Sequence, residues 1–420
     1  MRYRDILSIA AFRSFWIGQT ISLIGDAFYY VVFMFMVGKL TGSAAMVGFV
    51  GAVETIPFLL LSPYAGIIAD RIDRRKILLA TAIASGGLLT VFAILVLTVQ
   101  PLPIWTLFVT AGLTSVVTTF LLPAKNAAVP ALVPQDKLLT ANALNSVSTN
   151  LTPVFAHTLT ATVLTILYGL SPTIFFASIV GINAVSFFIS AAFFFRMPSI
   201  IPDRTEMPHA GEDLKQGFLY LRSRGDLKAL LWLTGALHLF LSPFFVVYIQ
   251  TNNTWFTGHP RDLALVEGSF FLAMTLCSLL VGRLHINRPG LSYGFSILVV
   301  GATIACMGFS RTVPLYIGWN LLCGFALPFA QIPMQTYLQI SVPDGLRGRV
   351  NSVLGMVYMG VMPIGLGLGG LMIDHIGLVT SYLVMGGGMA SAGLLAFILP
   401  EFRRAVIPAE AMPEGTAALS

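Results

Sequence analysis

The sequence contains very little charge. Only 10% of its 420 residues are Asp, Glu, Lys or Arg, and 56% are hydrophobic, whereas a soluble domain carries about 25% charged residues. A chain of this length could bury a large core, but it would lack the charged residues needed to cover its surface in water. The composition therefore predicts an integral membrane protein.

Cysteines and catalytic motifs are also scarce. The three cysteines, Cys277, Cys306 and Cys323, lie in apolar runs and have neither metal-ligand spacing nor the even number of a disulfide framework. We interpret them as buried small hydrophobic residues. The sequence contains no Gly-rich phosphate loop, no zinc-binding histidine pair and no nucleophile motif. We therefore expect neither enzyme activity nor a cofactor or metal.

Long apolar runs are abundant by contrast. A membrane helix needs about 20 mostly apolar residues, which predicts an all-α polytopic membrane protein with twelve transmembrane helices in two six-helix halves. The charged start of the chain leads into the first run without a cleavage site, so we expect that run to be retained. The predicted spans are 15–37, 46–68, 77–99, 104–122, 142–168, 173–195, 229–250, 264–284, 292–310, 314–340, 351–373 and 378–399.

The distribution of cationic residues predicts the topology. With both termini in the cytoplasm, only Lys39, Arg261 and Arg311 of the 24 Lys and Arg residues fall outside, and the rest, including Lys125 and Lys137 after the fourth span, fall inside. Cytoplasmic loops of membrane proteins are enriched in these residues. The same bias explains the net charge of +6 without nucleic acid. We expect a multi-pass protein of the cell (inner) membrane, functioning as a monomer.

The two halves share a short repeat. VPQDKLLTAN, with Pro134 and Asn142, follows the fourth span, and VPDGLRGRVN, with Pro343 and Asn351, follows the tenth. Six helices per half preserve orientation, so the repeat is parallel and its axis follows the membrane normal. The predicted domains are a bundle at 1–196, a cytoplasmic linker at 197–228, a second bundle at 229–400 and a cytoplasmic tail at 401–420.

The linker contains the run EDLKQGFLYLRSRGDLKAL. Phe218, Leu219 and Leu221 lie there among basic residues that include Lys215 and Arg222. This pattern is typical of a basic amphipathic helix on the inner membrane face. A simple connecting segment is the alternative interpretation.

A motif lies between the second and third spans. Its sequence is Gly66-Ile-Ile-Ala-Asp70-Arg71-Ile-Asp73-Arg74-Arg75-Lys76, and it resembles the G-x-x-x-D-R-x-G-R-R signature loop of the major facilitator superfamily, except that Asp73 replaces glycine. Several further stretches resemble the efflux branch of this superfamily, which contains macrolide and enterobactin exporters. These stretches are FRSFWIGQTISLIGDAF, LTGSA, ADRIDRRKILLA, PALVPQDKLLTANAL, EDLKQGFLYLRSRGDLKALL and LRGRVNSVLGMVYMGVMPIG.

The resemblance implies that this loop forms a conformational gate. Asp70 would contact the start of the eleventh helix and stabilise the outward-facing state, and Gly66 would allow a neighbouring helix to approach closely. Arg71, Arg74 and Arg75 would belong to the same gate. Alternatively, the arginines only mark topology, which for Arg75 is at least as well supported. The second-half loop, GRLHINR, has no acidic residue.

Polar residues within the spans are the candidates for transport chemistry. Burying a charge at the bilayer centre costs at least about 2.5–3.5 kcal/mol, so such residues usually face a cavity. Asp26 lies mid-span on the same helical face as Gln19 and Tyr29, and is a proton carrier or a fixed helix–helix hydrogen-bonding group. Glu54 is a second proton or cation site, or an acid in a wet vestibule.

The remaining polar candidates have weaker support. Asn150 and His157 belong to a polar stripe on the fifth helix, and Gln331 and Gln335 to one on the tenth; either stripe lines a cavity or joins helices. A satisfied structural role is slightly favoured for His157 and for His238 of the seventh helix.

Several prolines and glycines are expected to shape the helices. The antiporter branch often has a glycine–proline signature in the fifth helix, and here Pro153 lacks the flanking glycines. Pro363, Gly365 and Gly369 of the eleventh helix are expected to permit close packing and bending.

The sequence predicts a secondary transporter that exports an amphipathic small molecule, such as a drug, a siderophore or a lipid-like compound. The export is expected to be proton-coupled and to proceed by alternating access. An uncoupled facilitator, importer or lysolipid flippase of the same fold is the alternative, and a membrane receptor is the third.

Overall fold

The computed structural model describes residues 3–69, 71–134, 137–138, 140–142, 144–145, 148–149, 152, 171–201, 210–281, 284 and 286–407. Throughout these ranges the regular structure is helical, without a strand. The chain divides into two compact units. The first comprises residues 1–208 and 257–268, and the second comprises 209–256 and 269–420. Residues 257–268 thus group with the first unit, although the sequence places them in the second half.

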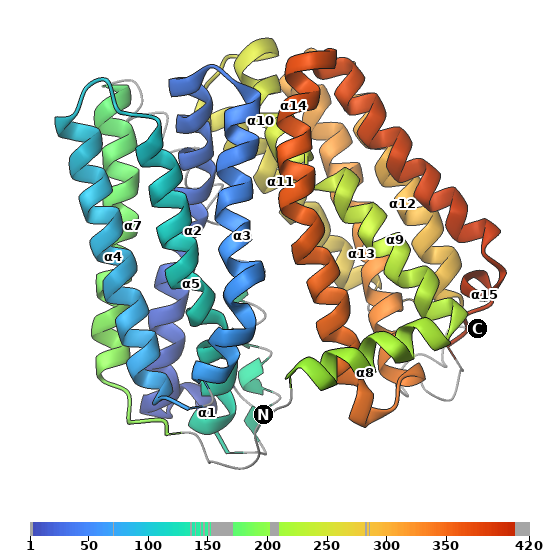
Figure 1. Cartoon of the computed structure of the whole chain (residues 1–420), viewed down its shortest axis with the longest axis horizontal. Helices are drawn as coiled ribbons and strands as arrows, with labels where there is room; N and C mark the ends of the chain where they lie inside the picture. The colour runs from blue at the N-terminus through green and yellow to red at the C-terminus, as the bar shows by residue number, and fades with distance from the viewer. Residues whose placement is uncertain are drawn as a thin grey trace. The chain divides into compact units, whose positions relative to one another are not determined.

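The first unit is a helical bundle (Figure 1). In it α2 packs against α7, α4 against α5 and α7, and α3 against α5. Its helices are α1 (Tyr3–Leu7), α2 (Ala10–Thr41), α3 (Ala44–Ala69), α4 (Arg74–Thr98), α5 (Trp105–Leu132) and α7 (Pro172–Phe195).

The second unit is also a bundle. The long helix α14 packs against α8, α9, α10 and α12, and α12 packs against α13. The helices are α8 (Ala210–Ser223), α9 (Gly225–Leu241), α10 (Phe244–Trp255), α11 (Pro260–Val281, whose first turns belong to the first unit), α12 (Pro289–Met307), α13 (Val313–Ser341), α14 (Asp344–Ile398) and α15 (Pro400–Arg403).

Ten segments of the described chain are long and apolar enough to cross a membrane. The last, Leu346–Ile398, contains the two final predicted spans, because Gly377 interrupts the helix with φ 77° and ψ 167°, a conformation that glycine adopts readily. Most of the fifth predicted span, 142–168, lies outside the described residues. The segments therefore fit the twelve-span plan. Large exposed apolar side chains, such as Trp232 and Phe195, are those expected on surfaces that face lipid.

The repeated VP segments have the same local structure in both units. Val133 follows α5 with φ −133° and ψ 146°, and Val342 follows α13 with φ −104° and ψ 127°. A following proline disfavours the helical conformation at the preceding residue. Pro134 and Pro343 thus end the two helices at equivalent positions, as a duplicated plan requires.

Glycines allow close helix packing in the second unit. A methyl group at Gly301 or Gly386 would collide with the facing helix, because α12 and α14 cross there. Gly365 and Gly369 of α14 face Ser242 and Pro243, between α9 and α10, where added methyl groups would collide too. Small residues at such crossings let backbones approach.

Gly66 lies near the end of α3. A methyl group there would meet no described atom within 4 Å, and the predicted approach of a neighbouring helix in the gate stays a prediction.

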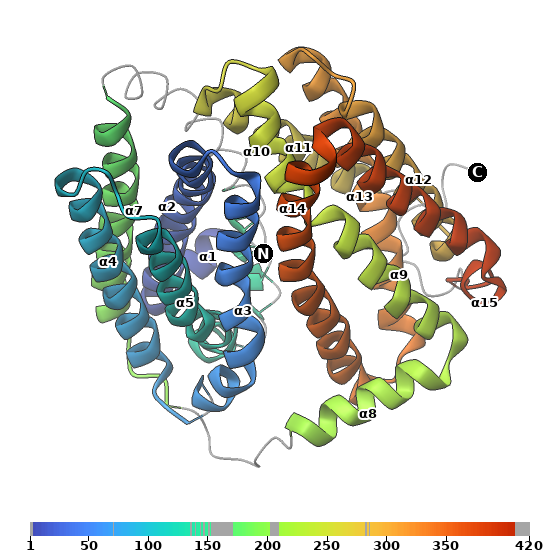
Figure 2. The same ribbon diagram turned by 45° about the horizontal axis from the view of Figure 1, so that its top comes forward.

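The amphipathic segment of the linker forms α8. Leu221 is fully buried and Gly217 lies against the backbone of Arg349 at the start of α14, whereas Phe218 and Leu219 are about half exposed. Figures 1 and 2 show α8 lying across the ends of α9 and α14. An apolar pair exposed beside basic residues matches the predicted membrane-surface helix, whose location at the inner face stays a prediction.

Candidate functional site

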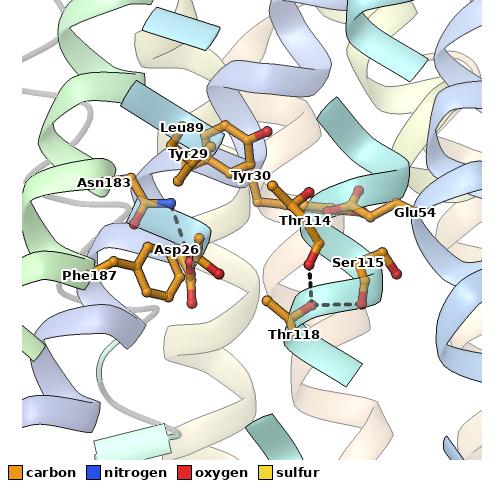
Figure 3. Close-up of a pocket in the computed structure, with 11 residues that line it drawn as sticks. Asp26, Tyr29, Tyr30, Glu54, Leu89, Thr114, Ser115, Thr118, Asn183 and Phe187 are labelled. Atoms are coloured by element: carbon orange, nitrogen blue, oxygen red, sulfur yellow. Dashed lines mark hydrogen bonds between the residues drawn. The ribbon is translucent and has the colours of Figure 1, made fainter. Parts of the chain in front are cut away.

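A polar cavity of about 230 Å³ lies inside the first unit. Figure 3 shows its acidic residues entering from different helices, Asp26 from α2 and Glu54 from α3. The lining residues are Asp26, Tyr29, Tyr30, Glu54, Ser85, Leu89, Thr114, Ser115, Thr118, Asn183 and Phe187. Three of them, Asp26, Tyr29 and Glu54, are predicted site residues, so the structure brings these three together.

Asp26 is held by α7. Its Oδ1 accepts a hydrogen bond from Asn183 Nδ2 at 3.3 Å, and Asn183 Oδ1 accepts one from Ser186 Oγ at 3.0 Å. This approach requires Gly25, because a Cβ at that position would collide with both Asn183 and Ser186. The absence of a side chain at Gly25 therefore allows Asn183 to approach Asp26.

A cation that interacts with Asp26 was not predicted from the sequence. Lys125 lies within α5, which continues through Pro123 and Pro130 to Leu132, and not in a loop. Its ammonium and the Asp26 carboxylate interact electrostatically. The segment after Pro123 remains mostly apolar, and that was the available signal, because prolines occur within membrane helices.

Two hydroxyl groups in the cavity have no partner. Tyr29 OH and Ser85 Oγ are buried and form no hydrogen bond with any described residue. Buried polar groups are almost always hydrogen-bonded, so each such exception requires water or a ligand. Two hydroxyl groups of the residues that line the cavity are therefore left without a hydrogen-bond partner among the described residues.

Glu54 belongs to the same electrostatic cluster. Its charge interacts with those of Asp26 and Tyr29. The hydroxyls of Thr114 and Thr118 donate to carbonyls of their own helix, at 2.7 Å to Thr110 O and 2.9 Å to Thr114 O. Their oxygen lone pairs stay available as acceptors on the α5 side of the cavity.

The other predicted polar residues that the structure describes do not line this cavity. Gln19 is buried on α2 and donates a hydrogen bond from Nε2 to Asn145 Oδ1 at 2.6 Å, which joins two segments of the bundle. In the second unit, His238 Nδ1 lies 2.8 Å from Thr234 O. Gln331 and Gln335 are exposed on α13. Asn150, Pro153 and His157 lie outside the described residues.

The loop between α3 and α4 is anchored by Asp73. Asp73 is the N-cap of α4, where its Oδ1 accepts from Arg75 N at 3.0 Å, and it also binds the segment after α7, through Ser199 Oγ at 2.7 Å and Ile200 N at 2.8 Å. Partial burial opposes ionisation, but these hydrogen bonds and the nearby Lys76 charge outweigh it and lower the pKa of Asp73. The departure from the signature glycine thus has a structural role.

The neighbouring arginines also bind within the first unit. Arg74 Nη1 donates to Ala127 O at 3.0 Å, and Arg75 Nη2 donates to Phe195 O at 2.5 Å and lies over the Phe195 ring. These contacts give both residues an intradomain role besides topology. Arg71 is exposed, and Asp70 lies outside the described residues. The gate assignment of Gly66, Asp70 and Arg71 therefore stays a prediction.

Two units built from membrane-length apolar helices, the first of which contains a polar cavity, have the architecture expected of a membrane transporter. The family model described as Major Facilitator Superfamily matches residues 15–359 and 241–418, and the chain belongs to this superfamily.

Relatives and solved structures agree with that assignment. Macrolide efflux protein A of Streptococcus pyogenes is 27% identical over 412 residues, covering 94% of this chain and 96% of the relative. Enterobactin exporter EntS of Shigella boydii is 25% identical over 414 residues, covering 94% and 93%. A structure of the nucleoside transporter NupG superposes with a TM-score of 0.70 at 14% identity, covering 93% and 100%, and supports the fold alone.

Proposed function

We propose that the protein exports an amphipathic small molecule across the cell membrane by alternating access. The inward flow of protons drives this export. The observation that carries this proposal is Asp26, an acid within a membrane span that faces a polar cavity and is positioned by Asn183. Acids at such depth usually serve ion or proton pathways. The names of the macrolide and enterobactin relatives support export and a cargo of that kind.

In the proposed cycle, Asp26 alternates between a protonated and an ionised form. The protonated acid removes a charge from the membrane interior, whereas the ionised acid retains its hydrogen bond from Asn183. Each form favours a different conformation of the bundle, because an uncompensated charge in low dielectric is costly. Proton entry on one side and release on the other would thereby drive the conformational exchange that carries cargo outward.

Lys125 supports a second candidate function. If its positive charge permanently neutralises Asp26, the acid needs no proton, and the protein would be an uncoupled facilitator of the same fold. The two functions differ in one measurable property, since only the first converts a proton gradient into net cargo movement.

Purified protein in vesicles with an acidic interior tests the proposal. Proton efflux should drive uptake of a labelled macrolide, the cargo class named for one relative, or of a compound found by comparing accumulation in cells with and without the protein. Asp26→Asn should abolish the gradient-driven component. Asp374→Asn, which neutralises an exposed acid outside the cavity, should leave it unchanged.

Gradient-driven uptake that survives in Asp26→Asn would rule out the proton-carrying role of Asp26. Exchange of cargo at the same rate with and without a gradient would instead establish the facilitator.

A further inference from the structure

Glu54 has no assigned role in the proton cycle, although it shares the cavity with Asp26. Asp26 receives a hydrogen bond from Asn183, whereas the interaction of Glu54 with its surroundings is electrostatic, through the charge of Asp26. An ionisable carboxylate inside a membrane bundle needs a compensating charge or donors. An ionised Glu54 therefore needs a cation in the cavity, whereas a protonated Glu54 does not.

The two unpartnered hydroxyls are the second observation that points to a ligand. Tyr29 is 6% exposed and Ser85 is 1% exposed, and the oxygens of both are buried without a hydrogen-bond partner among the described residues. They reach the cavity from α2 and α4, while Glu54 reaches it from α3. The cavity is thus lined by oxygen-bearing side chains from three helices.

The charge balance of the cavity favours a monovalent ion. The titratable groups that interact there are Asp26, Glu54, Tyr29 and Lys125, and Tyr30 also lines the space. Tyrosines are neutral near pH 7, and Lys125 offsets Asp26. When Asp26 and Glu54 are both ionised, one negative charge is left in the cavity, and a monovalent cation would neutralise it.

The donor chemistry narrows the class of ion further. Carboxylate and hydroxyl oxygens are hard ligands, which suit alkali and alkaline-earth ions and not the soft metals that prefer thiolate. Within the part of the chain that the structure describes, no group of three or more His, Cys, Asp or Glu residues is arranged to hold a metal. A divalent ion would therefore lack the carboxylates it usually requires.

We propose that this cavity binds Na⁺, with the Glu54 carboxylate as its charged ligand and the hydroxyls of Tyr29, Ser85 and Thr114 as neutral oxygen ligands. A volume of about 230 Å³ exceeds that of one ion, so ordered waters, each occupying about 30 Å³, complete the shell. The site is separate from the proton on Asp26, and it exists whether or not the protein exports cargo.

Direct binding measurements on the purified full chain test the site. The protein is placed in Na⁺-free choline buffer at pH 8 and titrated with ²²Na⁺, with choline replacing Na⁺ to keep ionic strength constant. We expect saturable binding of one ion per chain. Binding should weaken as pH falls, because protons compete for the carboxylate that ligates the ion.

Variants separate the ligands from the rest of the bundle. Glu54→Gln should weaken Na⁺ binding by about tenfold or more, and Ser85→Ala by a smaller factor, since losing groups that tune a metal site commonly costs about 10–100-fold in affinity. Glu54→Asp keeps the charge and should retain weakened binding if Glu54→Gln fails to fold. Glu267→Gln, an acid on α11 that does not line the cavity, should bind like wild type.

Absence of saturable binding to the wild type would overturn the site and leave a water-filled cavity. Wild-type affinity in a folded Glu54→Gln variant would overturn it as well. Because the measurement uses no gradient and no cargo, intact Na⁺ binding together with failed proton-driven uptake would contradict the export proposal alone.

Discussion

The two units each contain a cluster of polar groups, but only one cluster is complete. In the second unit, Thr251 Oγ1 lies 2.8 Å from Tyr382 OH, and Tyr316 OH lies 2.7 Å from the same oxygen. All three residues are fully buried. In the first unit, Tyr29 OH and Ser85 Oγ are buried equally well but unpaired.

The difference separates structural polarity from functional polarity. The hydroxyls of the second unit satisfy one another and join α10, α13 and α14, so nothing is left for a ligand. Aromatic contacts extend this cluster, as Trp255 packs on Tyr382 and Arg311 lies 3.7 Å from the Trp255 ring centroid. A fully paired network rigidifies a core, whereas an unpaired buried polar group is costly and calls for an explanation such as bound water or a ligand. By this criterion, we expect ion chemistry in the first unit.

The largest expected effect comes from adding a methyl group at Gly25, where α2 and α7 are in close contact. Gly25→Ala places a methyl group on the side chains of Asn183 and Ser186, so these side chains or the two helices must shift, and the hydrogen bond from Asn183 to Asp26 should be lost. Overpacking of this kind destabilises by about 1–3 kcal/mol or more, and proton-driven transport should be lost with it. Thermal unfolding of the purified protein, followed by the loss of its helical circular dichroism signal, measures the change.

Gly181→Ala is the matched control. It lies on the same helix as Asn183, but a methyl group there meets no described atom within 4 Å, and replacing a mid-helix glycine should stabilise by up to about 1 kcal/mol. Equal unfolding temperatures for Gly25→Ala and wild type would show that the close contact is not essential.

The second prediction breaks the complete cluster. Tyr382→Phe removes the hydroxyl shared by Thr251 and Tyr316, and leaving buried groups unpaired costs about 1–3 kcal/mol. The unfolding temperature should fall, and the remaining folded protein should keep its proton dependence. A normal unfolding temperature in Tyr382→Phe would mean that this network does not hold the second unit together.

The loops before α4 and α12 extend the comparison, because α4 has the acidic N-cap Asp73 whereas the N-cap of α12 is Arg288. Asp73→Ala removes the N-cap of α4 and the bonds to Ser199 and Ile200, which should cost about 1 kcal/mol. Since the folded pKa of Asp73 is lowered, its contribution is complete above the unfolded pKa of about 3.9 and is lost as pH falls through the folded value.

Unfolding temperatures of wild type and Asp73→Ala, compared from pH 7 down to pH 3, test this dependence. The difference between them should be constant near neutrality and should shrink in acid. A difference that does not change with pH would show that the ionised carboxylate contributes nothing.

Much of this architecture was predictable because membrane helices can be identified in a sequence by their length and apolar composition. The predicted spans within the described residues correspond to apolar helices, and Asp26, Tyr29 and Glu54 stood out because polar residues are costly in a bilayer. The fourth span was predicted to end at residue 122, whereas α5 continues through Pro123 and Pro130 to Leu132, so Lys125 lies in the helix and not in a loop.

The remaining cavity residues could not be found in the same way. Ser85, Thr114 and Asn183 resemble other small polar residues scattered along the helices, and only the packing of several helices decides which of them face a common space. The structural role of Asp73 was hidden for a related reason, since its partners Ser199 and Ile200 lie more than a hundred residues away in sequence.

The smallest expected effect concerns the incomplete cluster, and its smallness is informative. In Na⁺-free buffer, Tyr29→Phe should leave the unfolding temperature nearly unchanged, in contrast to Tyr382→Phe, because the Tyr29 hydroxyl has no described partner to lose. Adding Na⁺ should then stabilise wild type by about 1.4 kcal/mol for each tenfold rise in concentration above the dissociation constant. Tyr29→Phe should need more Na⁺ for the same gain, and Glu54→Gln should gain nothing. A loss of stability in Tyr29→Phe without Na⁺ would mean that its hydroxyl is already satisfied, and the two clusters would then be alike.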